Sequence, residues 1–222
     1  MRPLLLFLLL AAPTDPLAQL ERKPAAPARE AVRALLARDA LTTPESWRRA
    51  AAFFEKDAYR GPELSQAYEL LLAAAFEGDQ EARAKLPAAW DALQKAVSRP
   101  ERMKSAAPAV IRAAWAKGGA DPAAKSNPEL KALFDADQAP RHQEWSKLSQ
   151  AELEKIGRED EARMARMKEI LAAGALASPA DFENAGFLAQ HGSHWDDYVL
   201  AHELAVAAGL AGRAGRWLAA AS

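Results

Sequence analysis

No stretch of the chain alternates apolar and polar residues in the way that a half-buried β-strand requires. Ala, Leu, Glu, Arg and Lys dominate instead, and all five favour helices, while β-branched residues are scarce. We therefore predict an all-α protein. The expected helical segments are residues 29–38, 44–56, 63–77, 80–97, 101–117, 128–145, 149–173, 179–190, 196–209 and 213–221.

Capping residues and glycines separate these segments. Thr43-Pro44 and Ser178-Pro179 each combine an N-cap residue with proline at the first helical position, which is a favoured start for a helix. Glycine at the end of a helix adopts the left-handed conformation at little cost. The glycines that indicate helix ends or turns are Gly61, Gly78, Gly118, Gly119, Gly174, Gly192, Gly209 and Gly212.

Two parts of the sequence resemble each other. Residues 36–44 and 171–179 share Leu, Ala, Ala, Leu and Pro at one constant offset. After a slip of one residue, Ala-Tyr-Glu-Leu at 67–70 aligns with Ala-His-Glu-Leu at 201–204. Chance similarity between Ala-rich helices is the alternative explanation. We predict two divergent copies of a helical-hairpin unit that flank a central helical segment, because one hairpin cannot bury its own apolar face.

These copies define the expected organisation of the chain. The first helical-repeat unit covers residues 29–100. Residues 101–222 contain the central helices and the second unit. Residues 19–28 are polar and rich in Pro and Ala, which is typical of a linker.

The N-terminus has the pattern of a signal peptide. Met1-Arg2 precedes the apolar run Pro3–Ala12, which is too short to span a bilayer but suits a signal-peptide core. Cleavage after Ala18 would make residues 1–18 the signal peptide. An uncleaved anchor and a misassigned start codon are the alternatives. The pattern predicts a periplasmic or secreted protein without another transmembrane segment.

Composition excludes several classes of function. The chain contains 29 Lys and Arg against 30 Asp and Glu, so no global basic field attracts nucleic acid, and we expect no nucleic-acid partner. Cysteine is absent, which excludes disulfides, Cys-ligated zinc and thiol nucleophiles.

The second copy also matches a known repeat pattern. Residues 185–192 (Ala-Gly-Phe-Leu-Ala-Gln-His-Gly) are followed by Asp197-Tyr198, Ala201-His202-Glu203-Leu204 and Ala207-Ala208. This order resembles the Sel-type branch of tetratricopeptide-like (TPR-like) helical repeats. The resemblance implies helical hairpins that stack side by side and present a binding surface.

A further set of motifs lies in residues 127–222. It comprises Asn127-Pro128-Glu129-Leu130, Asp137-Gln138 with Arg141, Asp160 with Arg163, Gln190-His191-Gly192, Ala201-His202-Glu203-Leu204-Ala205 and Trp217-Leu218-Ala219-Ala220-Ala221. Together these motifs resemble a bacterial family whose domain has no assigned function. Members of that family continue into an Asp-Arg pair and a Gly-Thr-Gln ending, which these 222 residues do not contain. The resemblance implies a fold and a polar cluster, not a reaction.

Polar residues of the C-terminal half form a candidate site. An antiparallel hairpin brings the end of one helix, with His191, near the next helix, with His202. The candidate residues are Asp137, Gln138, Arg141, Gln190, His191, His202 and Glu203. We expect no cofactor, and zinc is the alternative because neutral imidazoles and a carboxylate suit that ion. Structural roles compete with this interpretation, since His191 can stabilise a helix C-terminus and His202 can bond between helices.

Catalytic motifs are missing from the sequence. His202-Glu203-Leu204-Ala205-Val206 begins like a zincin helix, but Val206 occupies the place of the second histidine. The glycines of residues 209–215 follow a predicted helix and not a strand, so they do not form a phosphate-binding loop. No Walker motif, serine elbow or EF-hand loop occurs.

The sequence is compatible with two functions. The favoured one is an exported helical-repeat module that binds a protein or peptide in a concave groove, with tryptophans as anchors. The six tryptophans are Trp47, Trp90, Trp115, Trp145, Trp195 and Trp217. The alternative is a metal- or anion-binding, hydrolase-like enzyme in which Arg141 binds an anion and a histidine acts as base or ligand.

Overall fold

The structure, a computed structural model, describes residues 15–56, 61–97 and 109–212, and all regular secondary structure in these ranges is helical. The prediction of an all-α protein is confirmed. The helices are α1 (Ala25–Leu36), α2 (Pro44–Glu55), α3 (Gly61–Phe76), α4 (Gln80–Val97), α5 (Ala109–Ala116), α6 (Pro128–Gln138), η2 (Ala139–His142), η3 (Trp145–Lys147), α7 (Gln150–Ala172), α8 (Pro179–Gln190) and α9 (Trp195–Leu210). The predicted helix 213–221, residues 101–108 and most of the predicted signal peptide lie outside the described residues.

Two helix boundaries differ from the prediction by four residues or more, the start of α1 and the end of α6, and a proline lies near each. Helix α1 begins at Ala25, so residues 19–28 are not a linker along their whole length. Pro27 lies in the first turn of α1, where its missing N–H removes no hydrogen bond. Helix α6 ends at Gln138 and not at residue 145, because Pro140 cannot donate to a preceding carbonyl, and the chain continues as the short 3₁₀ helix η2.

Two helical hairpins have matching dimensions. Helices α2 and α8 each contain 12 residues, and α3 and α9 each contain 16. Thr43 and Ser178 both form a capping box with proline in the first turn that follows. The side chain of Thr43 accepts a bond of 3.1 Å from the N–H of Ser46, and Ser178 accepts one of 3.2 Å from Asp181. The two hairpins therefore begin with the same local structure.

The turns that flank the hairpins also correspond. Asp39 follows α1 and Gly174 follows α7, and both have positive φ angles, of 52° and 67°. Gly78 and Gly212 follow α3 and α9 with φ angles of 97° and 86°. Each of these residues closes the helix by donating its N–H to the carbonyl three residues before it.

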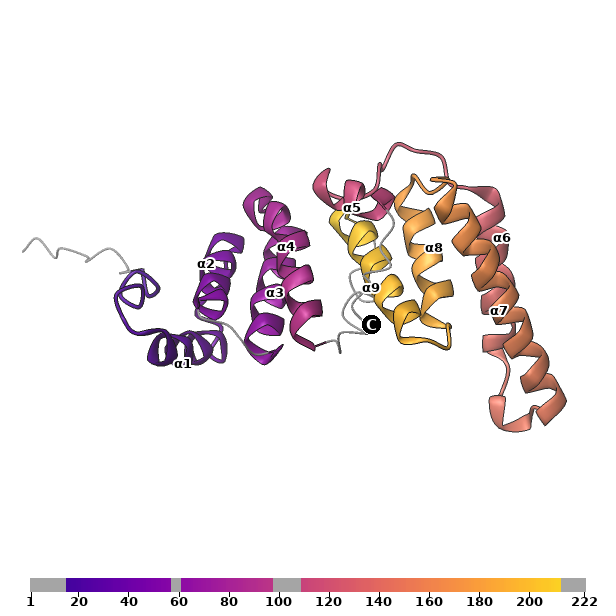
Figure 1. Cartoon of the computed structure of the whole chain (residues 1–222), viewed down its shortest axis with the longest axis horizontal. Coiled ribbons are helices and arrows are strands. Elements are labelled where there is room, and N and C mark those ends of the chain that lie inside the picture. The colour runs from indigo at the N-terminus through magenta and orange to yellow at the C-terminus, as the bar shows by residue number, and fades with distance from the viewer. Residues whose placement is uncertain (1–14, 57–60, 98–108, 213–222) are drawn as a thin grey trace, which may run out of the picture.

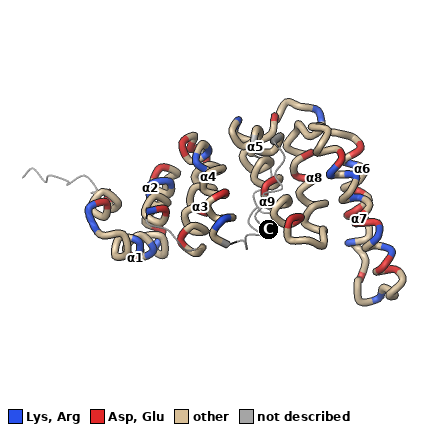
Figure 2. Tube along the Cα trace, in the orientation of Figure 1, with Lys and Arg blue, Asp and Glu red and all other residues tan. Residues whose placement is uncertain are grey.

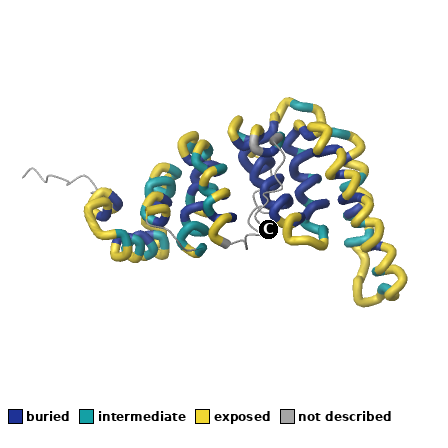
Figure 3. Tube along the Cα trace, in the orientation of Figure 1, coloured by how far each residue is buried: buried dark blue, intermediate teal, exposed yellow. Residues whose placement is uncertain are grey.

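Helix α9 lies at the centre of an elongated molecule. It packs against α8 on one side and contacts α5 and α3 on the other, so the helix order along the long axis is α2, α3, α9, α8 (Figure 1). Nearly every residue from Asp197 to Leu210 is buried (Figure 3). The larger of two hydrophobic clusters surrounds α9 and includes residues of α4, α5, α7 and α8. Helix α9 therefore joins the two ends of the fold.

A smaller hydrophobic cluster stabilises the N-terminal end. It is formed by α1, α2, Leu41 between them, Ala67 of α3 and the segment that precedes α1, in which Leu17 and Leu20 are buried. Arg49 of α2 binds the carboxylate of Glu21 in that segment at 2.8 Å. No helix within the described ranges is both long and apolar enough to cross a membrane.

The contact of Leu17 with this cluster gives a prediction about the N-terminus. A chain that begins at Gln19, as cleavage after Ala18 would produce, should be about 1.5 to 3 kcal/mol less stable than a chain that begins at Asp15, because a buried leucine side chain is lost. Urea unfolding of the two chains measures the difference. Leu17→Ala in the longer chain should reproduce most of the loss. Equal stability of all three chains would show that Leu17 does not contribute to the core.

Candidate functional site

Asp137, at the end of α6, is the centre of a buried polar cluster. Its Oδ1 accepts a hydrogen bond of 3.0 Å from Nη2 of Arg141, one turn further along the chain. Its Oδ2 lies 2.9 Å from Nδ1 of His191 at the end of α8, and also accepts a bond of 2.8 Å from Gln138. The Asp137 side chain is only 1% exposed. Four of the predicted site residues therefore meet.

Helix α7 extends this cluster with a second ion pair. Nη2 of Arg163 lies 2.6 Å from Oδ1 of Asp160. Oδ2 of Asp160 lies 3.3 Å from Nη2 of Arg141, which links the pair to Asp137. Figure 2 shows charged residues of both signs along α6 and α7. We call Asp137, Arg141, Asp160, Arg163 and His191 the polar cluster. The polar cluster links α6, α7 and α8 through hydrogen bonds and ion pairs. Such directional contacts fix how the helices are positioned along one another more specifically than apolar packing does.

The charges around Asp137 keep its carboxylate ionised. Burial alone would raise the pKa of Asp137, but the hydrogen bond with His191, the charges of His191 and Arg141, and the bond from Gln138 together lower it. Nε of Arg141 lies 3.1 Å from Nε2 of His191. The same Nε lies 3.2 Å from Nδ1 of His191, and Nδ1 is within hydrogen-bond distance of both carboxylate oxygens of Asp137. Both ring nitrogens of His191 are thus engaged within the protein.

A polar cleft of about 340 Å³ lies beside His191. Asp197 lines it, accepts a bond of 2.6 Å from Nζ of Lys168 and caps the start of α9 through the N–H of His194. Gly192 also lines the cleft, and a side chain there would overlap Asp197, which explains a glycine after His191. Among the described residues no group of three or more His, Asp or Glu side chains is arranged to hold a metal ion.

His202 and Glu203 form a separate cluster between α9, α3 and α4. Nε2 of His202 lies 2.8 Å from the hydroxyl of Tyr68. The imidazole of His202 stacks on the indole of Trp90, with 4.6 Å between ring centroids and an interplanar angle of 24°. Oε1 of Glu203 accepts a bond of 2.9 Å from Nε1 of Trp90. Tyr68 and His202 are each the eighth residue of a 16-residue helix.

The structure therefore divides the predicted site. Asp137, Gln138, Arg141 and His191 lie together, whereas His202 and Glu203 belong to the contact between the hairpins. Gln190 ends α8 with a partly exposed side chain. A single pocket containing Arg141 and His202 was required by the hydrolase-like alternative. Because the residues that line the cleft at His191 and those around His202 are different sets, that requirement is not met.

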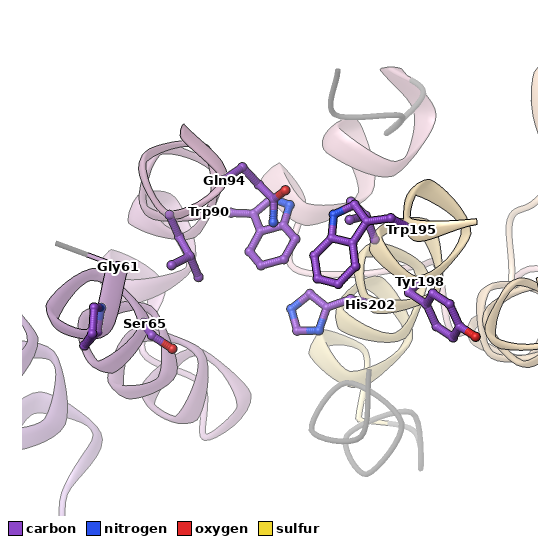
Figure 4. A pocket seen from close by; sticks show the side chains of 10 residues that line it. Gly61, Ser65, Trp90, Gln94, Trp195, Tyr198 and His202 are labelled. Carbon is purple, nitrogen blue, oxygen red and sulfur yellow. The ribbon is translucent and has the colours of Figure 1, made fainter. Parts of the chain in front are cut away.

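A largely apolar groove opens beside His202 (Figure 4). Its volume is about 520 Å³. The first turns of α3 and α9 and the last turns of α4 form its walls, and Trp195 points across it toward Trp90 (Figure 4). Trp195 and Tyr198 are 52% and 41% exposed. The described residues that line this interhairpin groove are Gly61, Pro62, Ser65, Trp90, Leu93, Gln94, Trp195, Tyr198, Val199 and His202, and none of these carries a carboxylate, amine or guanidinium group.

Sequence reasoning placed some of these residues and missed others. Trp90 and Trp195 were expected as groove anchors, but Tyr198 was not, although its spacing from Trp195 puts both on one helical face. Asp160 and Arg163 appeared only as matches to the bacterial family and not as site residues. Asp160 and Arg163 are three residues apart on α7, a helix that carries many other charged residues. The sequence therefore does not distinguish this pair from exposed ones, and only the fold shows that it is largely buried.

Comparison with protein-family models, with curated proteins and with solved structures finds no match for this chain. The resemblance to Sel-type repeats therefore rests on the motifs of residues 185–208.

Proposed function

We propose that this protein is an exported helical-repeat module that binds a segment of another protein in the interhairpin groove. The observation that carries the proposal is the exposure of Trp195 and Tyr198 at an apolar groove of about 520 Å³. Large aromatic side chains half exposed at a concave surface are typical of binding anchors, because burying them against a partner releases much water from apolar surface. A groove of this size accommodates a few residues of a peptide.

The matching hairpins support a repeat origin for the groove. The equal lengths of α2 and α8 and of α3 and α9, with the same caps and turns, support two divergent copies of one TPR- or Sel-like unit. The groove lies where the second helix of each copy begins. Repeat proteins use the surface between neighbouring units to bind extended partners.

The N-terminal apolar run supports export. Pro3–Ala12 has the length and composition of a signal-peptide core and follows an arginine. The proposed location is therefore the periplasm or the extracellular space. The absence of cysteine is compatible with the cytoplasm as well as the periplasm, so it does not bear on this proposal.

A structural role explains the polar cluster better than catalysis. A catalytic histidine needs one nitrogen directed at the substrate, whereas both nitrogens of His191 contact Asp137 and Arg141. The carboxylates of Asp137 and Asp160 are likewise bound by arginines. We therefore assign the polar cluster to the packing of α6, α7 and α8 and do not propose an enzymatic activity.

Selection of peptides from a random displayed library tests the binding function. Peptides enriched on the parent protein should lose at least 10-fold in affinity for a Trp195→Ser/Tyr198→Ser variant, because interface anchors of this kind each contribute more than about 1 kcal/mol. Trp145→Ser is the matched control, since Trp145 is 46% exposed on η3, away from the groove. Failure to enrich any peptide, or equal binding to both variants, would contradict the proposed function.

A further inference from the structure

We propose that the N-terminal end of the fold attaches the protein to a membrane surface that contains anionic phospholipids. The apolar run of residues 3–12 stays on the chain and enters the bilayer, and a basic cleft beside it binds the phosphate headgroups. This surface is separate from the interhairpin groove, so the inference goes beyond the proposed function. The observations that carry it are the burial of residues that signal-peptide cleavage would remove, the short connection between the apolar run and the cleft, and the charges that line the cleft.

The fold uses residues that cleavage after Ala18 would remove. The side chain of Leu17 is only 1% exposed within the smaller hydrophobic cluster. Oδ1 of Asp15 accepts a bond of 3.0 Å from the N–H of Leu17, and the carbonyl of Leu17 accepts one of 2.9 Å from the N–H of Leu20. Asp15 also pairs with Arg49 of α2. A signal peptide that is removed contributes nothing to the mature fold, so these contacts favour a chain that keeps its N-terminus.

The apolar run joins the fold beside the cleft, at one end of the elongated molecule (Figure 1). Arg49, the partner of Asp15, is one of the residues that line the cleft. Ala12 and Asp15 are three positions apart, and a chain of that length spans at most about 11 Å. The headgroup layer on each side of a bilayer is about 5 to 8 Å thick. An apolar run inserted in the hydrocarbon core therefore holds the cleft at or just outside the level of the headgroups.

The apolar run needs a second contact for stable attachment. It is about half as long as a segment that spans a bilayer, so it enters the membrane from one side only. A single short apolar anchor binds a membrane reversibly, and a group of basic residues is a common second contact. Lys and Arg side chains near an anionic surface each add to the attraction. The cleft is placed to make this second contact.

The cleft combines basic side chains with an apolar floor. Its volume is about 270 Å³, and Lys23, Arg49 and Lys56 line it. Glu21 also lines the cleft and pairs with Arg49 at 2.8 Å. Lys23 and Lys56 form no ion pair within the described residues, so both ammonium groups can bind a phosphate. The other lining residues are the apolar Ala25, Ala28, Ala52 and Phe53, which suit the glycerol and ester groups next to the phosphate.

The residues around the cleft are also basic on balance. Arg29 adjoins the cleft, because its Nη1 donates a bond of 2.9 Å to the carbonyl of Lys56. Arg22 precedes Lys23 and is exposed, as is the acidic Glu55 before Lys56. Two arginines against one glutamate add to the positive charge of the two lysines. An anionic headgroup therefore complements this surface, and a neutral one does not.

Binding of the full chain to lipid vesicles tests the inference. The chain is purified in detergent and transferred to vesicles of phosphatidylcholine alone, or of phosphatidylcholine and phosphatidylglycerol in equal amounts, and flotation measures the bound fraction. Binding to the mixed vesicles should be at least about 10-fold tighter at low salt, and the difference should shrink at high salt. Lys23→Gln/Lys56→Gln should weaken binding to the mixed vesicles by about 5-fold per lysine and leave binding to neutral vesicles unchanged.

Lys117→Gln/Lys125→Gln is the matched control. Both lysines are exposed between α5 and α6, away from the N-terminal end, and form no ion pair within the described residues. This variant should bind both kinds of vesicle as the parent does, and circular dichroism verifies that all variants fold. An equal loss in the two double variants overturns the inference, because the cleft would then have no special role. Equal affinity of the parent for the two kinds of vesicle overturns it as well.

Retention of the apolar run is measured separately. Mass spectrometry of the chain recovered after expression of residues 1–222 in bacteria should find residues 3–12 still attached, and a chain that begins at Gln19 overturns the inference. Lys23→Gln/Lys56→Gln should bind library peptides as the parent does, since neither lysine lines the interhairpin groove. Peptide binding without preference for anionic vesicles therefore contradicts this inference alone. Preference for anionic vesicles without enrichment of any peptide contradicts the proposed function alone.

Discussion

Replacing Asp137 with alanine should lower the free energy of unfolding by about 3 to 5 kcal/mol. The carboxylate is buried, and it is bound by Arg141 and His191. Its removal leaves the partly buried guanidinium of Arg141 with Asp160 as its remaining acidic partner and removes the acceptor of His191. Removing one partner of a buried ion pair destabilises the fold because the other charge remains shielded from water without its partner. Urea unfolding at neutral pH measures the loss.

Asp135 provides the control for this variant. It lies on the same helix, pairs with Lys131 and is mostly exposed, so Asp135→Ala should change the free energy of unfolding by no more than about 0.5 kcal/mol. Similar effects of the two substitutions would show that the polar cluster does not stabilise the fold.

The stabilisation by Asp137 should also depend on pH. Because the pKa of Asp137 is lowered in the folded state, its contribution is complete above the unfolded pKa of about 3.9. It is lost as pH falls through the folded pKa. The stability difference between the parent and Asp137→Asn should therefore be constant near neutral pH and shrink below about pH 4. A difference that grows on acidification would contradict the direction of the pKa shift.

Replacing Trp115 with alanine should destabilise the protein by about 3 to 5 kcal/mol. Trp115 is fully buried on α5 within the larger hydrophobic cluster, and its indole donates a bond of 3.0 Å to the carbonyl of Glu203 on α9. Its loss creates a large cavity beside the central helix and removes a bond between α5 and α9. Thermal and urea unfolding measure the effect.

Two further substitutions separate the packing of Trp115 from its hydrogen bond. Trp115→Phe keeps most of the buried ring area and loses the donor, so its cost should be about half that of alanine or less. Trp145→Ala removes an exposed indole and should cost no more than about 0.5 kcal/mol. If Trp115→Phe were as harmful as Trp115→Ala, the hydrogen bond and not the packing would dominate.

The helices were largely predictable because local chemistry fixes their ends. Thr43 and Ser178 begin helices where the sequence indicates, and α4 and α8 have the predicted bounds. The predicted bounds were wrong at the start of α1 and the end of α6, where a proline can either lie within the first turn of a helix or end one. Pro27 is accepted in the first turn of α1, whereas Pro140 stops α6, and the difference depends on the position of each proline relative to a helix start that the sequence does not fix.

The candidate site was only partly predictable. Asp137 and Arg141 are one turn apart on the chain, so their contact follows from the α-helical and 3₁₀ backbone alone. The position of His202 depends on how the two hairpins face each other. Its partner Tyr68 is distant in sequence, and no local pattern encodes that pairing. The interhairpin groove likewise depends on the separation of α4 and α9, which only tertiary packing determines.

The division of the interior into two hydrophobic clusters has a consequence for partial unfolding. Trp47 and Leu70 pack against both clusters, and the contact of α2 with α3 joins them further, because Ala51 of α2 belongs to the larger cluster and Ala67 of α3 to the smaller one. Detaching this end exposes much less apolar surface than global unfolding, so it requires less free energy. Trp90, Leu93 and Val199 belong to the larger cluster. Gly61, Pro62 and Ser65 of α3 also line the groove, and α3 packs against α2, so such an opening removes the support of one groove wall and should weaken binding there.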